Sequence, residues 1–93
     1  MRVIKKDGRI QSFDIIKIRS SILGASIDSN TIINEADLKV LSNSVLKSLK
    51  DLRGDEGLTS TYEIFAIIIE TLNKDGFNDI AMSYLGYKSK SDK

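Results

Sequence analysis

The sequence predicts a small α+β domain, mostly α-helical, in which an N-terminal β-hairpin packs on about four helices. Three observations support this prediction. The pair Asp7-Gly8 lies between two short runs of extended character, and such a pair is the strongest short-range signal for a hairpin. Farther along the chain, apolar residues recur every three or four positions, as they do on amphipathic helices. Helix-capping residues precede these apolar runs.

The length and composition indicate a single globular domain. With 93 residues the chain can bury only a small core. We expect residues 2–88 to form the domain and residues 89–93 to form a polar tail that frays. Hydrophobic residues make up 41% and charged residues 29%, fractions that suit a globular protein. The sequence has no apolar run of about 18 residues, so we expect no membrane span and a cytoplasmic location.

The hairpin is predicted from strands near residues 2–6 and 9–13. A two-residue loop made of Asp7 and Gly8 would adopt a type I′ turn, in which both central residues need positive φ. In that register hydrophobic side chains fall on both faces of the hairpin. Either both faces are partly covered, or the loop is longer than two residues.

The first two helices are predicted from their caps and their apolar stripes. Asp14 can cap the first helix, and Phe13 and Ile18 fit a hydrophobic staple around that cap. The apolar stripe of this helix is Ile15, Ile18, Ile22 and Ala25, and residues 27–30 are expected to form a loop. A second helix starts near Asn34, ends at Gly54, and buries Leu38, Leu41, Val45, Leu49 and Leu52.

The last two helices are predicted in the same way. Ser60 and Glu63 match a capping box at the start of the third helix. Gly76 is placed to end that helix in the left-handed conformation, and Asn78 is expected to cap a short fourth helix that reaches Tyr87. The expected inward face of the third helix consists of Ile64, Ile67, Ile68 and Leu72.

The composition argues against an enzyme. The chain contains no Cys and no His, which excludes thiolate–imidazole zinc sites, cysteine nucleophiles and histidine acid–base catalysis. Neither of the common glycine-rich phosphate motifs is present. Glu63 and Glu70 stand nearly two turns apart on one helix, where a solvated helix face is a better interpretation than a catalytic carboxylate pair.

Basic residues concentrate at the N-terminal end of the chain. Residues 1–19 hold six basic and two acidic side chains, whereas the whole chain has a net charge of +1. The ammonium groups stand beside the start of a helix, whose dipole attracts phosphate. The candidate site residues here are Lys5, Lys6, Gln11, Phe13, Asp14, Lys17 and Ile18. An alternative interpretation is a hairpin edge kept basic to discourage aggregation, with Asp14 acting as a simple cap.

The same residues carry a resemblance to the ATP-cone domain, whose usual pattern is V-x-K-R-D-G-R, then F-(D/N), K-I and S-I. The matching segments are Val3–Arg9, Phe13-Asp14, Lys17-Ile18, Ser21-Ile22, Leu58–Ile64, Asp79–Ala81, Tyr84 and Tyr87-Lys88. ATP-cones are regulatory domains of ribonucleotide reductases and of the repressor of reductase genes. The resemblance implies an allosteric domain that binds ATP or dATP, with Mg²⁺ arriving on the nucleotide.

The resemblance also implies roles for single residues. Lys5, Lys6 and Lys17 would contact phosphates, Phe13 and Ile18 would line the base site, and Asp14 would bind base or ribose. Thr61 would lie near the nucleotide. Gln11 stands where Glu is common, and Phe65 stands where some members have His. With no zinc-ribbon cysteines and no catalytic domain, we expect a free-standing or excised cone that controls a second copy of the chain or a reductase-type partner.

Two other functions are compatible with the sequence. The chain could be a helical interaction module that has lost nucleotide binding, which the departures at Gln11 and Phe65 favour. It could also bind nucleic acid through the basic hairpin, but the near-neutral net charge argues against that function.

Overall fold

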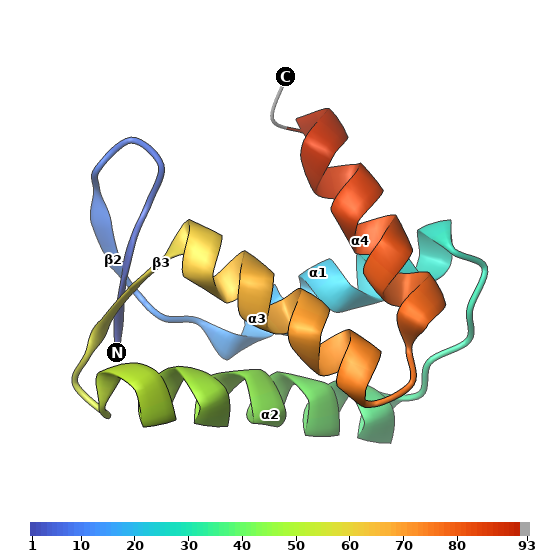
Figure 1. Ribbon diagram of the computed structural model, residues 1–93, viewed down its shortest axis with the longest axis horizontal. Helices are drawn as coiled ribbons and strands as arrows, with labels where there is room; N and C mark the ends of the chain where they lie inside the picture. Colours follow the sequence, from blue (N-terminus) through green and yellow to red (C-terminus); the bar gives the residue numbers. More distant parts are fainter. Residues whose placement is uncertain (92–93) are drawn as a thin grey trace.

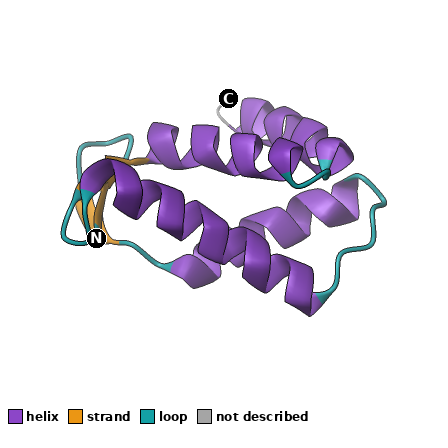
Figure 2. Cartoon of the chain, turned by 60° about the horizontal axis from the view of Figure 1, so that its bottom comes forward, coloured by secondary structure: helices purple, strands orange, loops and turns teal. Residues whose placement is uncertain are grey.

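Four helices and a three-stranded sheet make up the part of the chain that the computed structural model describes, namely the backbone of residues 1–91 and the side chains of residues 1–86 (Figure 1). The elements are β1 (Arg2–Ile4), β2 (Ile10–Ser12), α1 (Ile15–Asp28), α2 (Glu35–Arg53), β3 (Leu58–Ser60), α3 (Thr61–Lys74) and α4 (Asn78–Ser91). The sheet lies at one end of the helices (Figure 2). The predicted α+β class, mostly helical with an N-terminal hairpin, is confirmed.

The hairpin turn differs from the predicted type I′ turn. The Gly8 N–H donates to the Lys5 carbonyl at 2.9 Å, and the Lys5 N–H donates to the Arg9 carbonyl at 2.7 Å. Gly8 has a φ of +89°, but Asp7 is not in the left-handed region, so the loop is three residues long. The Asp7 carboxylate accepts bonds from the Arg9 backbone N–H at 3.1 Å and from its Nε at 2.6 Å. These bonds stabilise the turn that the structure adopts.

The longer loop moves the strand register by one residue. Val3 stands opposite Gln11, and Ile4 stands opposite Ile10. A one-residue shift moves every side chain of a strand to the other face. As a result Val3 is buried, whereas Ile4 and Ile10 are exposed.

The third strand is not predicted by the sequence pattern. β3 pairs in parallel with β1, so the strand order is β2-β1-β3 and β1 is central. β3 has only three residues, and its partner lies more than fifty residues earlier in the chain. Such a short segment has no periodicity of its own, and its pairing depends on tertiary contacts.

The helix starts agree with their predicted caps. Asp14 accepts a bond from the Ile16 N–H at 3.0 Å, and Asn34 accepts one from the Asp37 N–H at 2.7 Å. The fourth start differs by one position, because Asn78 is the first residue of α4 rather than its cap. α1 extends to Asp28, so the predicted loop at 27–30 is shorter than expected.

The helix ends also follow the glycine signals. Gly54 and Gly76 both have positive φ, at +79° and +88°. After α3, the Phe77 N–H donates to the Leu72 carbonyl at 2.8 Å, which is the closing bond of a Schellman motif. The predicted polar tail begins at residue 89, whereas α4 continues to Ser91; Asp92 and Lys93 lie outside the described residues.

The core lies between the four helices. α1 packs on α2 and α4, and α3 packs on the same two helices. Fully buried side chains come from every helix and include Ile22, Leu41, Val45, Leu49, Ile68, Leu72 and Ile80. The prediction that Leu52 joins this core is wrong, because its side chain is 63% exposed in the last turn of α2. No helix among the described residues is long and apolar enough to cross a membrane.

Candidate functional site

A cleft of about 490 Å³ opens between the hairpin and the first turns of α1 and α3, with α4 along one side. Its lining comes from segments far apart in the sequence. The lining residues are Val3, Lys5, Lys6, Ser12, Phe13, Asp14, Lys17, Ile18, Ser21, Thr61, Tyr62, Ile64, Phe65, Tyr84 and Leu85.

The structure brings most of the candidate site residues together in this cleft. Those in the lining are Lys5, Lys6, Phe13, Asp14, Lys17, Ile18 and Thr61. Gln11 is the exception: its half-buried side chain stands opposite Val3 in the sheet, outside the lining of the cleft. Seven of the eight candidate residues thus share one cleft, and a ligand-binding role for all eight stays a prediction.

The charges of the cleft favour an anion. Three ammonium groups, those of Lys5, Lys6 and Lys17, line it together with one carboxylate, that of Asp14. The first turns of α1 and α3 both contribute lining residues, so two helix N-termini lie at the cleft. The positive end of each helix dipole adds to the attraction for a negatively charged ligand.

Asp14 caps α1, with or without a ligand in the cleft. Its Oδ1 accepts the capping bond from the Ile16 N–H at 3.0 Å. A carboxylate has two oxygens that can each accept more than one hydrogen bond. Asp14 is exposed and lines the cleft, so it can cap α1 and accept a bond from a ligand hydroxyl or amino group.

Part of the cleft lining is apolar and aromatic. The rings of Phe65 and Tyr84 stack with their centroids 5.4 Å apart and an interplanar angle of 27°. Phe13 and Ile18 add apolar surface from the start of α1. The flat ring system of a ligand could pack on such a surface while the charged groups of the same ligand face the lysines.

Tyr62 also lines the cleft and is not among the predicted site residues. Its side chain is 66% exposed, and the Lys6 ammonium lies 5.8 Å from the ring centroid. The sequence positions of Tyr62, Phe65 and Tyr84 could have identified these three aromatic residues as part of the candidate site. Tyr62 and Phe65 lie on the first turns after the capping box, and Tyr84 lies in the closing segment of the sequence pattern.

Thr61 connects the two sides of the cleft. Its Oγ1 donates to the Ile4 carbonyl oxygen at 3.3 Å, which joins the start of α3 to β1. Lys5 and Lys6 follow directly after β1. The position of the two lysines is therefore tied to the position of α3.

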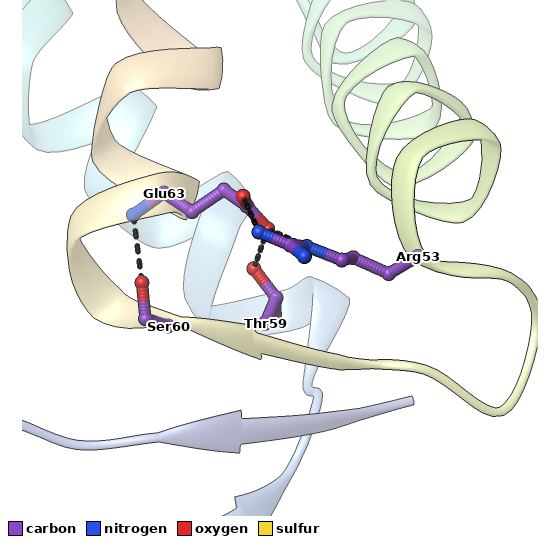
Figure 3. A network of polar contacts seen from close by, with 4 residues as sticks. All are labelled: Arg53, Thr59, Ser60 and Glu63. Atoms are coloured by element: carbon purple, nitrogen blue, oxygen red, sulfur yellow. Dashed lines mark hydrogen bonds and ion pairs between the residues drawn. The ribbon is translucent and has the colours of Figure 1, made fainter.

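A polar network lies behind the first turn of α3 (Figure 3). The Glu63 carboxylate accepts bonds from Arg53 Nε at 3.0 Å, from Arg53 Nη2 at 2.7 Å and from Thr59 Oγ1 at 2.7 Å. These bonds hold the pKa of Glu63 below its ordinary value, the Arg53 hydrogen bonds being the larger cause. Only half of the predicted capping box is formed as expected: Ser60 Oγ accepts from the Glu63 N–H at 3.1 Å, but the carboxylate is engaged elsewhere.

Within the described residues, no group of three or more His, Cys, Asp or Glu side chains is placed to hold a metal ion.

The comparison with protein families is decisive for the family of this chain. The model of the ATP cone domain matches residues 1–93, the whole chain. The chain belongs to the ATP-cone family. ATP-cones are regulatory domains that bind nucleotides, and they are not catalytic. A search of curated proteins finds no match to the chain.

Proposed function

We propose that this ATP-cone binds ATP or dATP in the cleft between the hairpin and the first turns of α1 and α3. The observation that carries the proposal is the pairing of three lysines and two helix N-termini with an apolar, aromatic wall. Lys5, Lys6 and Lys17 would bind the phosphates, and Phe13 and Ile18 would support the base. We assign residues 2–88 to this domain and residues 89–93 to a polar tail.

Mg²⁺ would enter with the nucleotide. The described residues offer no carboxylate cluster for a metal, so the phosphates would supply its ligands. We infer no hydrolysis, because phosphoryl transfer needs held metal ions and a residue that orients the attacking group. The nucleotide would then act as an allosteric ligand.

The regulatory step would begin at the hairpin. Lys5 and Lys6 follow β1, and β1 is tied to α3 through Thr61, so a bound triphosphate would draw the hairpin and the helices together. This movement would change the surface that the domain presents to a partner. We propose that the partner is a second copy of the chain or a reductase-type protein. Light scattering with and without ATP or dATP would show whether the chain itself assembles.

A thermal-shift panel of adenine and guanine nucleotides, in ribo and deoxy forms, tests the binding site. A ligand at 100 times its Kd should stabilise the fold by about 2.7 kcal/mol. The double variant Lys5→Gln with Lys17→Gln should lose the shift produced by ATP and dATP. The matched control, Lys47→Gln with Lys50→Gln, removes two exposed lysines of α2 that do not line the cleft and should keep the shift.

A second candidate function is a helical interaction module that has lost nucleotide binding. Gln11 lies outside the cleft lining, and Phe65, which lines it, stands where some members of the family have His. Two results would favour this function. Titration calorimetry at millimolar ATP and dATP would give no heat of binding, and neither nucleotide would change the melting temperature.

A further inference from the structure

Glu63 joins three elements through one carboxylate. Arg53 is the last residue of α2, Thr59 is the central residue of β3, and Glu63 lies in the first turn of α3 (Figure 3). The guanidinium contacts both carboxylate oxygens, which fixes the relative orientation of the two groups. The Thr59 side chain is buried, and the Glu63 side chain is only 20% exposed. The Arg53 side chain is 50% exposed, so the network lies at the edge of the fold, with its Thr59 and Glu63 members turned inward.

The network holds the first turn of α3 from the side away from the cleft. Tyr62 and Ile64, the neighbours of Glu63 in the chain, both line the cleft, whereas Arg53, Thr59 and Glu63 do not. On the cleft side, the bond from Thr61 to Ile4 ties the turn to β1, and at 3.3 Å this bond is long for a hydroxyl donor.

The hydrogen bonds to the Glu63 carboxylate are shorter than the bond from Thr61 to Ile4. Two of them measure 2.7 Å and one 3.0 Å, and one partner is a guanidinium. Hydrogen bonds to a charged partner are shorter and stronger than neutral ones. The stronger hydrogen bonds of the turn thus lie on its side away from the cleft.

α2 provides a fixed reference for this arrangement. Leu49, one turn before Arg53, is fully buried in the core. The chain then returns to the sheet through a tight turn, in which the Gly57 N–H donates to the Gly54 carbonyl at 3.1 Å. The Gly57 carbonyl accepts from the Arg2 N–H at 3.0 Å, which leads into β1. The end of α2 is thereby connected to both β1 and α3.

We propose that Arg53, Thr59 and Glu63 are positioning residues for the nucleotide site. Through them the core-anchored end of α2 sets the orientation of the first turn of α3, and so the placement of Thr61 and Tyr62 in the cleft. This inference rests on the proposed binding of ATP or dATP in the cleft. It extends the site to residues that are not themselves part of the cleft lining.

Two variants test the network, each by changing one of the two side chains that donate to Glu63. Thr59→Val keeps the shape of the side chain but removes the hydroxyl donor, and Arg53→Ala removes the guanidinium. Each should raise the Kd for ATP about five-fold, a change within the range expected for residues that act through a network. Thr59→Ser, which keeps the hydroxyl, should bind ATP as the unmodified chain does.

A control on the same helix is Asp51→Asn, which removes the exposed Lys47–Asp51 ion pair and should leave the Kd unchanged. Calorimetric titrations are run well below the melting temperature of each variant, so that loss of folded protein does not raise the Kd. Amide NMR spectra without nucleotide should show shifts at Thr61 and Tyr62 in Thr59→Val but not in Thr59→Ser.

The outcomes separate this inference from the proposed function. If the unmodified chain binds neither ATP nor dATP, the proposed function fails and this inference fails with it. If the unmodified chain binds ATP and both Thr59→Val and Arg53→Ala bind it equally well, only the positioning role is overturned. A lower melting temperature with an unchanged Kd would count as the same result, because it would show a purely structural role.

Discussion

The Thr61 hydroxyl donates a hydrogen bond to the carbonyl oxygen of Ile4, 57 residues earlier in the chain, with an Oγ1–O distance of 3.3 Å. This bond links the helix start on one side of the cleft to the strand that leads to Lys5 and Lys6 on the other. Neither residue is near the other in sequence. The site therefore exists only when β1 and α3 are docked.

Replacing Thr61 by Val should lower the free energy of unfolding by about 1 kcal/mol, because a typical intramolecular hydrogen bond contributes that much. Thr61→Ser keeps the hydroxyl and should lose less. Urea denaturation of both variants without nucleotide measures the difference. Equal stability of Thr61→Val and the unmodified chain would mean that the long bond contributes nothing.

Asp14→Ala should lower the free energy of unfolding by about 1 kcal/mol, since it removes the cap of α1. Asn is an equally good cap, so Asp14→Asn should keep the stability. Any loss of nucleotide affinity in Asp14→Asn then reports the carboxylate charge in the cleft and not the helix. Denaturation and titration of the same two samples make the comparison, and a stable Asp14→Ala would contradict the capping role.

Two glycine substitutions should have opposite effects. A Cβ at Gly57 would lie 2.6 Å from the carbonyl carbon of Arg53, a backbone atom that cannot easily move away. Gly57→Ala should therefore lower stability by about 2 kcal/mol or more. Gly24 lies inside α1, and a methyl group added there would meet no atom within 4 Å, so Gly24→Ala should raise stability by up to about 1 kcal/mol. Thermal melts of the two variants decide the sign of each effect.

Acid should weaken the link at Glu63. Bonds from Arg53 and Thr59 lower its pKa in the folded protein, so the ionised carboxylate contributes stability above its unfolded pKa of about 4.3. That contribution is lost as the pH falls below this value toward the folded pKa. Glu63→Gln, which cannot ionise, should be less stable than the unmodified chain at pH 7. Denaturation at pH 7 and at pH 3 should show the gap narrowing in acid; a constant gap would argue against the ionic contribution.

Salt should weaken the binding of ATP more than that of adenosine. The lysines of the cleft attract the phosphates through charge, and the Debye length falls from roughly 14 Å at 0.05 M to about 4 Å at 0.5 M salt. The Kd for ATP should rise several-fold over this range. Adenosine has no phosphates and serves as the control, and equal salt dependence of the two ligands would mean that the lysines do not bind the phosphates.

One part of the candidate site could be predicted from the sequence, and another part could not. The spacing of Lys5, Lys6, Asp14 and Lys17 around a hairpin and a helix cap was enough to predict that these groups gather, because they lie close together in the chain. The aromatic wall could not be predicted as a unit. Phe65 and Tyr84 come from different helices, and their stacking depends on how α3 packs on α4.

The sequence by itself determined the local structure: the caps at Asp14, Asn34 and Ser60, the glycine ends of α2 and α3, and the mostly helical class. These features depend on hydrogen bonds and conformational preferences within a few residues. The tertiary structure alone decided the pairing of β3 with β1 and the Arg53–Glu63 contact. Each of these requires the chain to choose among partners that no local pattern distinguishes, and only the packing of the helices makes that choice.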